Sequence, residues 1–522
     1  MTKNFTAILT NMINEWQHHH DNPLQSVQLA SGTTLQIYPK SVQQLQSDIV
    51  FIARQDHIKS MFVFTRANSN SAIAGRLAEA SEIEPSLRCA PLNHQNAAAI
   101  REQFAFARPV LIGLANSFGL GDRLGLANPA HLRAIADTPF RAVLAQQSIR
   151  ELERTERTAE EVMDAATWAV LQEGYKQGFG ADADHLKTTA DVDRMMKAGF
   201  TFFTIDPGAY VVNGVTTLSA EELAKQVSRL PWDVLADTSA GMFSRYEGKT
   251  FRIAAGFEIT PTADQIRFAL VKYGAVIART AELYHYLTSK HNGKPFEVEL
   301  SVDETDSPTT PFEHFFIANE LKRLEIKLVS LAPRFIGDFE KGIDYKGDLA
   351  RFEAEYIWHA HIAAALGPYK ISIHSGSDKF RVYDVIGRLK LGPVHIKTAG
   401  TSYLEALRTL AENKTALFDE ILDFARSRYE TDKASYHVSA MLARVPSAGA
   451  CTPQQRLQLF EDEQARQVLH VTFGSVLTAR DDSGKLRFKD RILRALSEYE
   501  EAHYRNLQRH FQRHLAPFLQ NT

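Results

Sequence analysis

The sequence predicts an α/β protein whose main part is a (β/α)₈ barrel of the TIM type. From residue 110 onward, eight short apolar runs occur, each followed by a polar or glycine-rich loop and then a segment with helical spacing. Strand patterns that alternate with helical ones imply parallel βαβ units, and eight such units imply closure into a barrel. The alternative is a doubly wound open sheet, but no G-x-G-x-x-G turn follows the first run. The expected strands are 110–115, 142–147, 200–206, 296–303, 326–332, 369–374, 394–398 and 468–473.

Three other parts accompany the predicted barrel. Residues 1–105 mix helical segments with short strand patterns, which predicts an N-terminal α+β cap. The barrel is expected over 106–480, with an insertion after its third strand at about 207–262, because the gap before the fourth strand is longer than one helix needs. Residues 481–522 predict a C-terminal helical extension that covers either the barrel or an oligomer contact. The sequence is therefore compatible with a homo-oligomer.

Composition narrows the class of protein. The 522 residues are 44% hydrophobic and 23% charged, which is ordinary for a globular chain. A formal net charge of −3 gives no bulk attraction for nucleic acid or anionic lipid, so we expect neither as a partner. Two cysteines are too few for a disulfide framework, and no apolar run approaches the roughly 20 residues that cross a bilayer. We expect a cytoplasmic protein.

Acidic side chains gather where one predicted strand passes into a helix. In the segment 301–321, Asp303, Glu304 and Asp306 lie at the end of the strand or beyond it. Pro308 and Pro311 then stiffen the turn. The active site of a barrel enzyme lies at the carboxyl ends of its strands. This junction is therefore expected to contribute to a reaction centre.

The alternation of residues along the strands selects which side chains face the barrel lumen. It directs Asp206, His374 and Lys397 inward. An inward histidine close to acids from neighbouring strands has the ligand types of a divalent-metal site, for which we expect His374, Glu304 and Glu340 as ligands. These ligands do not distinguish zinc, manganese, nickel and iron. The alternative is that His374 is a hydrogen-bonded core residue and the acids are solvated loop caps.

Two loops after late strands favour an anionic ligand. Residues 375–378 and 398–402 pass from strand to helix through small residues, and free backbone N–H groups at a helix start bind anions. A carboxylate or phosphate of the substrate is expected there. The alternative is that both loops are N-capped tight turns. The candidate substrate-binding residues are Gln147, Arg334, Ser375, Lys397 and Thr398.

Taken together, the loops of the predicted barrel resemble those of the tagaturonate epimerase family of hexuronate catabolism. The resemblance covers roughly 110–475. It implies a divalent-metal-dependent isomerase that interconverts D-tagaturonate and D-fructuronate, which differ at carbon 4, with ketohexoses such as tagatose and fructose as further substrates. The segments that carry it are GLGDRLG (119–125), TIDPG (204–208), SVDETDSPTTP (301–311), LAPRF (331–335), IHSGSD (373–378) and KTAGTS (397–402).

The chemistry of such an epimerization limits the mechanism. The hydrogen on carbon 4 is β to the carbonyl at carbon 2 and is not acidic, so three routes remain: transient oxidation, a carbonyl shift to carbon 3, or retro-aldol cleavage and re-addition. Oxidation needs a dinucleotide site, and without its fingerprint we expect no NAD. The other two routes pass through enediolates, for which we expect Asp206 and Glu304 as the acid/base pair, with Asp303 as the substitute if Glu304 serves the metal. The alternatives are a metal-dependent aldolase, a sugar isomerase and, more distantly, a non-catalytic sugar-binding protein.

Overall fold

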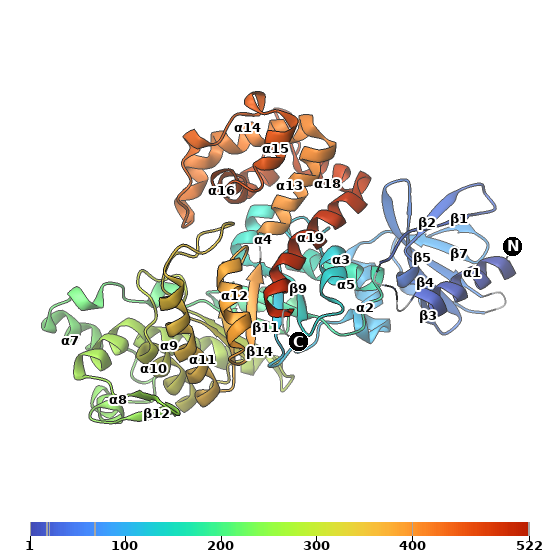
Figure 1. Ribbon diagram of the computed structural model, residues 1–522. Helices are drawn as coiled ribbons and strands as arrows, with labels where there is room; N and C mark the ends of the chain where they lie inside the picture. The colour runs from blue at the N-terminus through green and yellow to red at the C-terminus, as the bar shows by residue number, and fades with distance from the viewer. Residues whose placement is uncertain (1, 17–18, 20, 67–68, 399, 520–522) are drawn as a thin grey trace. The chain divides into compact units, whose positions relative to one another are not determined.

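Eight parallel strands form a closed barrel, as the sequence predicts. Figure 1 labels the elements, with the N-terminal sheet drawn in blue. The computed structural model describes residues 2–16, 19, 21–66, 69–398 and 400–519. In chain order the barrel strands are β8 (Ser117–Leu120), β9 (Arg141–Ser148), β10 (Gly180–Leu186), β11 (Phe202–Ile205), β14 (Glu297–Ser301), β15 (Ser330–Ala332), β16 (Lys370–Ile373) and β17 (Val394–Thr398). The helices that follow them are α3 (Asn128–Ile135), α4 (Ile149–Thr155), α5 (Ala159–Gln172), α6 (Thr189–Lys197), α9 (Ala263–His291), α10 (Pro311–Arg323), α11 (Leu349–Leu366), α12 (Phe380–Leu389) and α13 (Thr401–Asn413).

Three of the predicted strand positions differ from the structure. Residues 468–473 belong to the end of α16 (Glu463–Val471) and the start of the next helix, because Ala465, Val468 and Leu469 are buried at helical spacing behind an Asp462 N-cap. The strand β10 was missed, since its sequence Gly-Ala-Asp-Ala-Asp-His-Leu carries acids where an apolar run was sought. The first strand was also placed wrongly, because β8 spans Ser117–Leu120 and shares no residue with the predicted 110–115.

An antiparallel sheet forms the N-terminal region, which agrees with the predicted α+β cap. Its strand order is β1-β2-β4-β5-β7-β6, and β3 pairs with β4. The strands are β1 (Gln25–Gln28), β2 (Thr34–Ile37), β3 (Gln43–Leu45), β4 (Asp48–Gln55), β5 (Ile58–Thr65), β6 (Ser81–Glu84) and β7 (Leu87–Ala90). On one face, Phe51 and Phe62 pack with Leu9 of α1 (Thr2–Glu15). On the other, Ile52 packs in a core with Ile100 of α2 (His94–Gln103) and with α5.

The predicted insertion lies between β11 and α9. It contains α7 (Ala220–Ser228), α8 (Ser239–Tyr246) and the hairpin of β12 (Phe251–Ala254) with β13 (Phe257–Ile259). The Tyr246 hydroxyl at the end of α8 donates to Glu320 Oε1 of α10 at 2.6 Å, and this glutamate is fully buried. A buried carboxylate requires such partners, so the pair fixes the insertion onto the helix layer.

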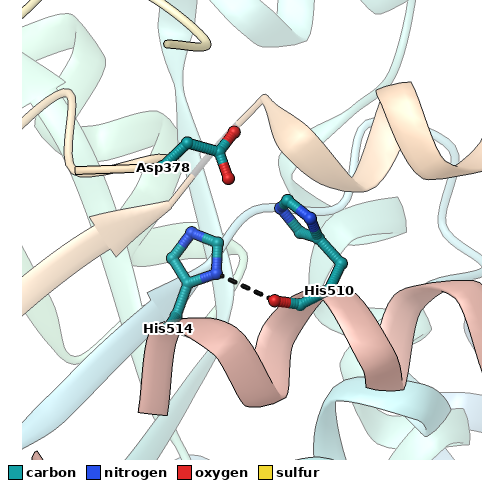
Figure 2. Close-up of side chains that lie close together, drawn as sticks. All are labelled: Asp378, His510 and His514. Carbon is teal, nitrogen blue, oxygen red and sulfur yellow. Dashed lines mark hydrogen bonds between the residues drawn. The ribbon is translucent and has the colours of Figure 1, made fainter. Parts of the chain in front are cut away.

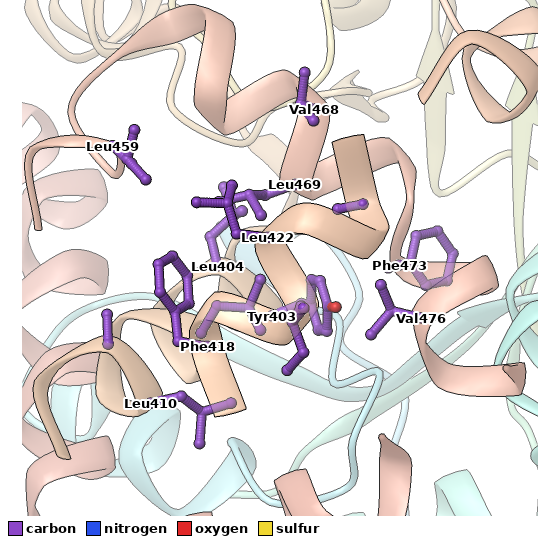
Figure 3. Close-up of a cluster of buried hydrophobic side chains, with 14 of the residues drawn as sticks. Tyr403, Leu404, Leu410, Phe418, Leu422, Leu459, Val468, Leu469, Phe473 and Val476 are labelled. Carbon is purple, nitrogen blue, oxygen red and sulfur yellow. The ribbon is translucent and has the colours of Figure 1, made fainter. Parts of the chain in front are cut away.

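Helices from α13 onward pack around a large apolar core (Figure 3), and the predicted C-terminal extension, residues 481–522, contains the last two of them. Leu404, Phe418, Leu422 and Leu469 are each at most 1% exposed in this cluster. The remaining helices are α14 (Thr415–Asp432), α15 (Pro453–Gln458), α17 (Phe473–Thr478), α18 (Lys489–Glu498) and α19 (Glu500–Leu519). Among the described residues, every helix is too short or too polar to span a bilayer.

The chain divides into two compact units. The first comprises residues 1–110, 120–181 and 399–515, and the second comprises 111–119, 182–398 and 516–522. The strands from β11 to β17 therefore lie in the second unit together with most of β10 and β8. This unit contains the charged cluster described next.

Candidate active site

A buried lysine marks the centre of a charged cluster in the second unit. Lys397 of β17 places its Nζ 2.8 Å from Asp182 Oδ2, 2.7 Å from Asp184 Oδ1 and 2.8 Å from Glu299 Oε1. Two of these acids come from β10 and one from β14, so the alternation of residues along three strands turns all four side chains inward. Burial disfavours the charge of Lys397, but the carboxylates outweigh it and raise its pKa well above the ordinary value.

His374 extends this cluster at the carboxyl end of β16. Its Nε2 lies 2.6 Å from Glu299 Oε1, and its Nδ1 lies 3.1 Å from Asp303 Oδ1. Burial favours the neutral ring, yet Asp303 and Glu299 outweigh burial and raise the pKa of His374 to about 10. Conversely, His374 holds the pKa of Asp303 far below its usual value although burial alone would raise it. The imidazole therefore bridges two carboxylates.

A second histidine lies beside the first. His185 Nδ1 is 3.2 Å from Asp206 Oδ2, and the ring packs edge to face on His374 with 5.2 Å between the centroids. Burial lowers the pKa of His185, but Asp184 and Asp206 raise it to about 9. His185 has a left-handed φ of 54°, at the point where the β10–β11 register shifts. Such strain in a residue with a Cβ is typical of functional positions.

Asp206 follows β11 and is 5% exposed. Burial alone would raise the pKa of this carboxyl, but the His185 hydrogen bond and the nearby Lys187 outweigh it, and the pKa is lowered. The Gly208 backbone N–H also donates to Asp206 Oδ1 at 2.9 Å. Asp206 is therefore an ionised carboxylate next to a protonated imidazole.

Of the residues predicted from sequence, the structure brings Asp206, His374 and Lys397 together in this cluster. Glu304 is exposed, whereas the neighbouring Asp303 contacts His374. Glu340 is buried, and its Oε1 lies 3.5 Å from Lys346 Nζ. The roles of these side chains stay predictions.

The predicted substrate-binding residues differ in their surroundings. Arg334 is half-buried, and its Nε has no hydrogen-bond partner among the described residues. Ser375 Oγ accepts from Lys341 Nζ at 2.6 Å, and Thr398 Oγ1 donates to the Gly119 carbonyl at 2.9 Å. In the first unit, Gln147 of β9 is buried, and the structure gives its amide atoms no partner within the described ranges.

Sequence reasoning missed four members of the cluster. Asp182, Asp184 and His185 lie on the strand that was not recognised, and Glu299 lies inside a predicted strand. The signal that could have found them was present, because acids at every second position of 182–184 and 297–299 point to one face of a strand. A buried face lined with acids needs cations, and Lys397 and the two histidines supply them.

A different pair of histidines lies in the first unit. His510 and His514 stand one turn apart on α19, both buried, and His514 Nδ1 lies 3.2 Å from the His510 carbonyl oxygen (Figure 2). The third side chain drawn there, Asp378, follows β16 and belongs to the second unit. Histidines at this spacing have the ligand type and helical face that metal sites use.

Comparison with known proteins identifies the family of this chain. The model of the tagaturonate epimerase family matches residues 38–518. The tagaturonate/fructuronate epimerase of Thermotoga maritima is 40% identical over 484 residues, which are 93% of this chain and 97% of that protein. The native crystal structure of the fructuronate-tagaturonate epimerase of Cohnella laeviribosi superposes with a TM-score of 0.88 at 35% identity, covering 94% of this chain and 97% of that one. A glycerol complex of the same enzyme gives a TM-score of 0.87 at 34% identity, covering 93% and 96%. The chain therefore belongs to the tagaturonate epimerase family and is an enzyme of the isomerase class.

Proposed function

We propose that this enzyme interconverts D-tagaturonate and D-fructuronate by inverting carbon 4. The observation that carries the proposal is the presence of two imidazole–carboxylate pairs, His185 with Asp206 and His374 with Asp303, beside a buried lysine. Family membership along almost the whole chain supports the same substrate pair. The free thiols of Cys89 and Cys451 fit the cytoplasm as the place of action.

The two pairs can transfer protons on a sugar backbone. Asp206 is ionised and accepts a proton, while the protonated His185 next to it donates one. Asp303 with His374 forms the second such pair. We take Asp303 as the second proton-handling carboxylate, because it contacts His374 and the predicted Glu304 is exposed. Either the carbonyl-shift or the retro-aldol route can use two pairs from different strands.

The charge of the cluster fits a divalent cation. Its carboxylates are Asp182, Asp184, Asp206, Glu299 and Asp303. Lys397 balances one of these charges and Lys187, 3.4 Å from Asp206 Oδ2, balances a second. The remaining negative charge keeps both histidines protonated or else favours a dication that displaces those protons. His374 and His185 would hold the ion, with Glu304 and Glu340 as the other predicted ligands, and Asp206 and Asp303 would remain as the proton-transferring carboxylates. A bound divalent ion supplies Lewis-acid polarisation of the sugar oxygens.

Arg334 is the best candidate for holding the carboxylate of the substrate. Lys397 is fully engaged with three acids, whereas the Arg334 guanidinium has a buried Nε without a partner in the described chain. The Arg334 backbone is fixed, since its N–H donates to Thr309 Oγ1 at 3.0 Å and its carbonyl accepts from the Thr309 N–H at 2.8 Å. A guanidinium presents a planar fork that matches a carboxylate.

The test is incubation of the protein with D-tagaturonate, with and without a chelator, followed by NMR of the products. Formation of D-fructuronate that stops on chelation and returns with a divalent ion is expected. Three-carbon fragments without the epimer would replace the proposal by an aldolase. Deuterium uptake at carbon 4 selects the carbonyl-shift route, and inversion without uptake selects retro-aldol. Parallel incubation with D-tagatose shows whether ketohexoses are substrates as well.

A further inference from the structure

A cavity of about 560 Å³ lies within the first unit. It is lined by the N-terminal sheet, by α5, by the loop after β8 and by α18 and α19. Its volume is within the range of small-molecule sites. All of its lining residues belong to the first unit, whereas the His185 and His374 cluster belongs to the second.

Two cations in the cavity wall form no ion pair among the described residues. Arg157 donates to the backbone carbonyls of Asp122 at 2.5 Å and of Glu161 at 3.1 Å, and Lys489 donates to the Thr155 carbonyl at 2.7 Å. Within the part of the chain that the structure describes, neither forms an ion pair. Lys59, which also lines the cavity, differs, since its Nζ lies 2.7 Å from a Glu500 carboxylate oxygen.

The acids in the same wall are already engaged. Asp164 accepts from Arg101 at 2.8 Å and pairs with His94 at 2.9 Å. The Glu161 carboxylate closes the capping box of α5 by accepting the Thr158 N–H at 2.8 Å. Both carboxylates attract Arg157 at longer range, but among the described residues neither forms an ion pair with Arg157 or Lys489. Burial and then repulsion from Arg157 lower the pKa of Lys489, and the attraction of Glu161, Glu156 and Asp490 does not offset them.

We propose that this cavity binds a small organic anion, whose acidic group is held by Arg157 and Lys489. The half-buried side chains of Leu124, Leu126 and Leu493 line the rest of the space and would contact the body of the ligand. Carboxylate and phosphate groups both pair with a guanidinium and an ammonium, so either class is accepted. The site goes beyond the proposed epimerization, which uses residues of the second unit.

Calorimetric titration of the full-length protein with inorganic phosphate, and separately with D-gluconate, tests the proposal. Saturable binding is expected, and Lys489→Gln and Arg157→Gln should each weaken it about 10- to 100-fold. Lys489→Glu places a tethered carboxylate beside Arg157 and should abolish binding without lowering the melting temperature. If only gluconate binds, the site recognises organic acids. If phosphate binds as well, the site recognises the acidic group itself.

Lys485→Gln is the matched control, because Lys485 is exposed four residues before Lys489. It should bind both anions as the wild type does. The proposal is overturned if the wild type binds neither anion at millimolar concentration, or if the Lys489→Glu variant binds them unchanged. Epimerase turnover should be retained in Lys489→Gln, so failure of the anion site is distinguished from failure of the proposed reaction.

Discussion

The second unit contains two pairs of histidines that behave in opposite ways. His185 and His374 lie among carboxylates, and their pKa values are raised to about 9 and about 10. His314 and His359 pack with 2.8 Å between their Nδ1 atoms, and His314 Nε2 lies 2.8 Å from the Tyr369 hydroxyl. Burial lowers the pKa of His359 to about 3 and that of His314 well below its ordinary value.

The difference shows that burial alone does not make a histidine part of a reaction site. His374, His314 and His359 are buried and His185 is half-buried, but only the pair of His185 and His374 faces acids from neighbouring strands. In the His314 pair, one neutral ring donates and the other accepts, which is a structural contact between α10 and α11. In the His374 pair, the ring is held as a cation that a metal ion or a proton transfer can replace.

Removing the carboxylate from one imidazole–carboxylate pair should have the largest effect. We expect Asp206→Asn, and likewise Asp303→Asn, to lower turnover by about 10²–10⁴-fold, the scale of general acid–base catalysis. Asp193→Asn is the control, since Asp193 is exposed on α6 and accepts only from the Tyr286 hydroxyl. NMR measures the turnover of D-tagaturonate by each variant. Near-normal rates in both Asp206→Asn and Asp303→Asn would contradict the acid–base mechanism.

A smaller effect is expected at Glu299, which fixes the His374 ring through Nε2. Carboxylates that orient a metal-binding histidine typically contribute 10–100-fold in metal affinity, so Glu299→Gln should weaken divalent-ion binding by about that factor. Glu297→Gln is the matched control, because Glu297 lies on the same strand and accepts the Ile112 backbone N–H at 3.1 Å. Competition with a metal indicator gives the affinities, and equal values in the two variants would contradict the assignment.

Sequence patterns predicted the barrel well where strands were apolar or strictly alternating. The strands β14, β16 and β17 fall within the predicted runs, because side chains alternate there between lumen and helix layer. The pattern failed for β10, where Asp182 and Asp184 interrupt the apolar run. An acidic residue normally argues against a buried strand. Inside this barrel the two aspartates are stabilised by their ion pairs with Lys397, which comes from a distant strand.

The candidate site was predictable residue by residue but not as a set of contacts. Parity along single strands turned His374, Asp206 and Lys397 inward, and this required no knowledge of neighbouring strands. Which acid meets which cation depends on strand order and register, for example the Ser372–His395 alignment of β16 and β17. That information is absent from local periodicity, so Glu299 was not assigned as the partner of His374.

The smallest effect expected concerns the pH dependence of stability at the other histidine pair. The folded-state pKa of His359 is lowered below its unfolded value near 6.5, so its contribution is fully present above pH 6.5 and is lost as the pH falls towards 3. Between pH 7 and pH 5 this histidine alone should cost about 2 kcal/mol of unfolding free energy. Urea unfolding of the wild type and of His314→Gln/His359→Leu at both pH values measures it. The double variant should lose less stability on acidification. The other two histidines, His185 and His374, have raised folded-state pKa values, so their contribution to stability is lost only as the pH rises above 6.5. An equal loss in both proteins would mean that the His314 pair is already solvated.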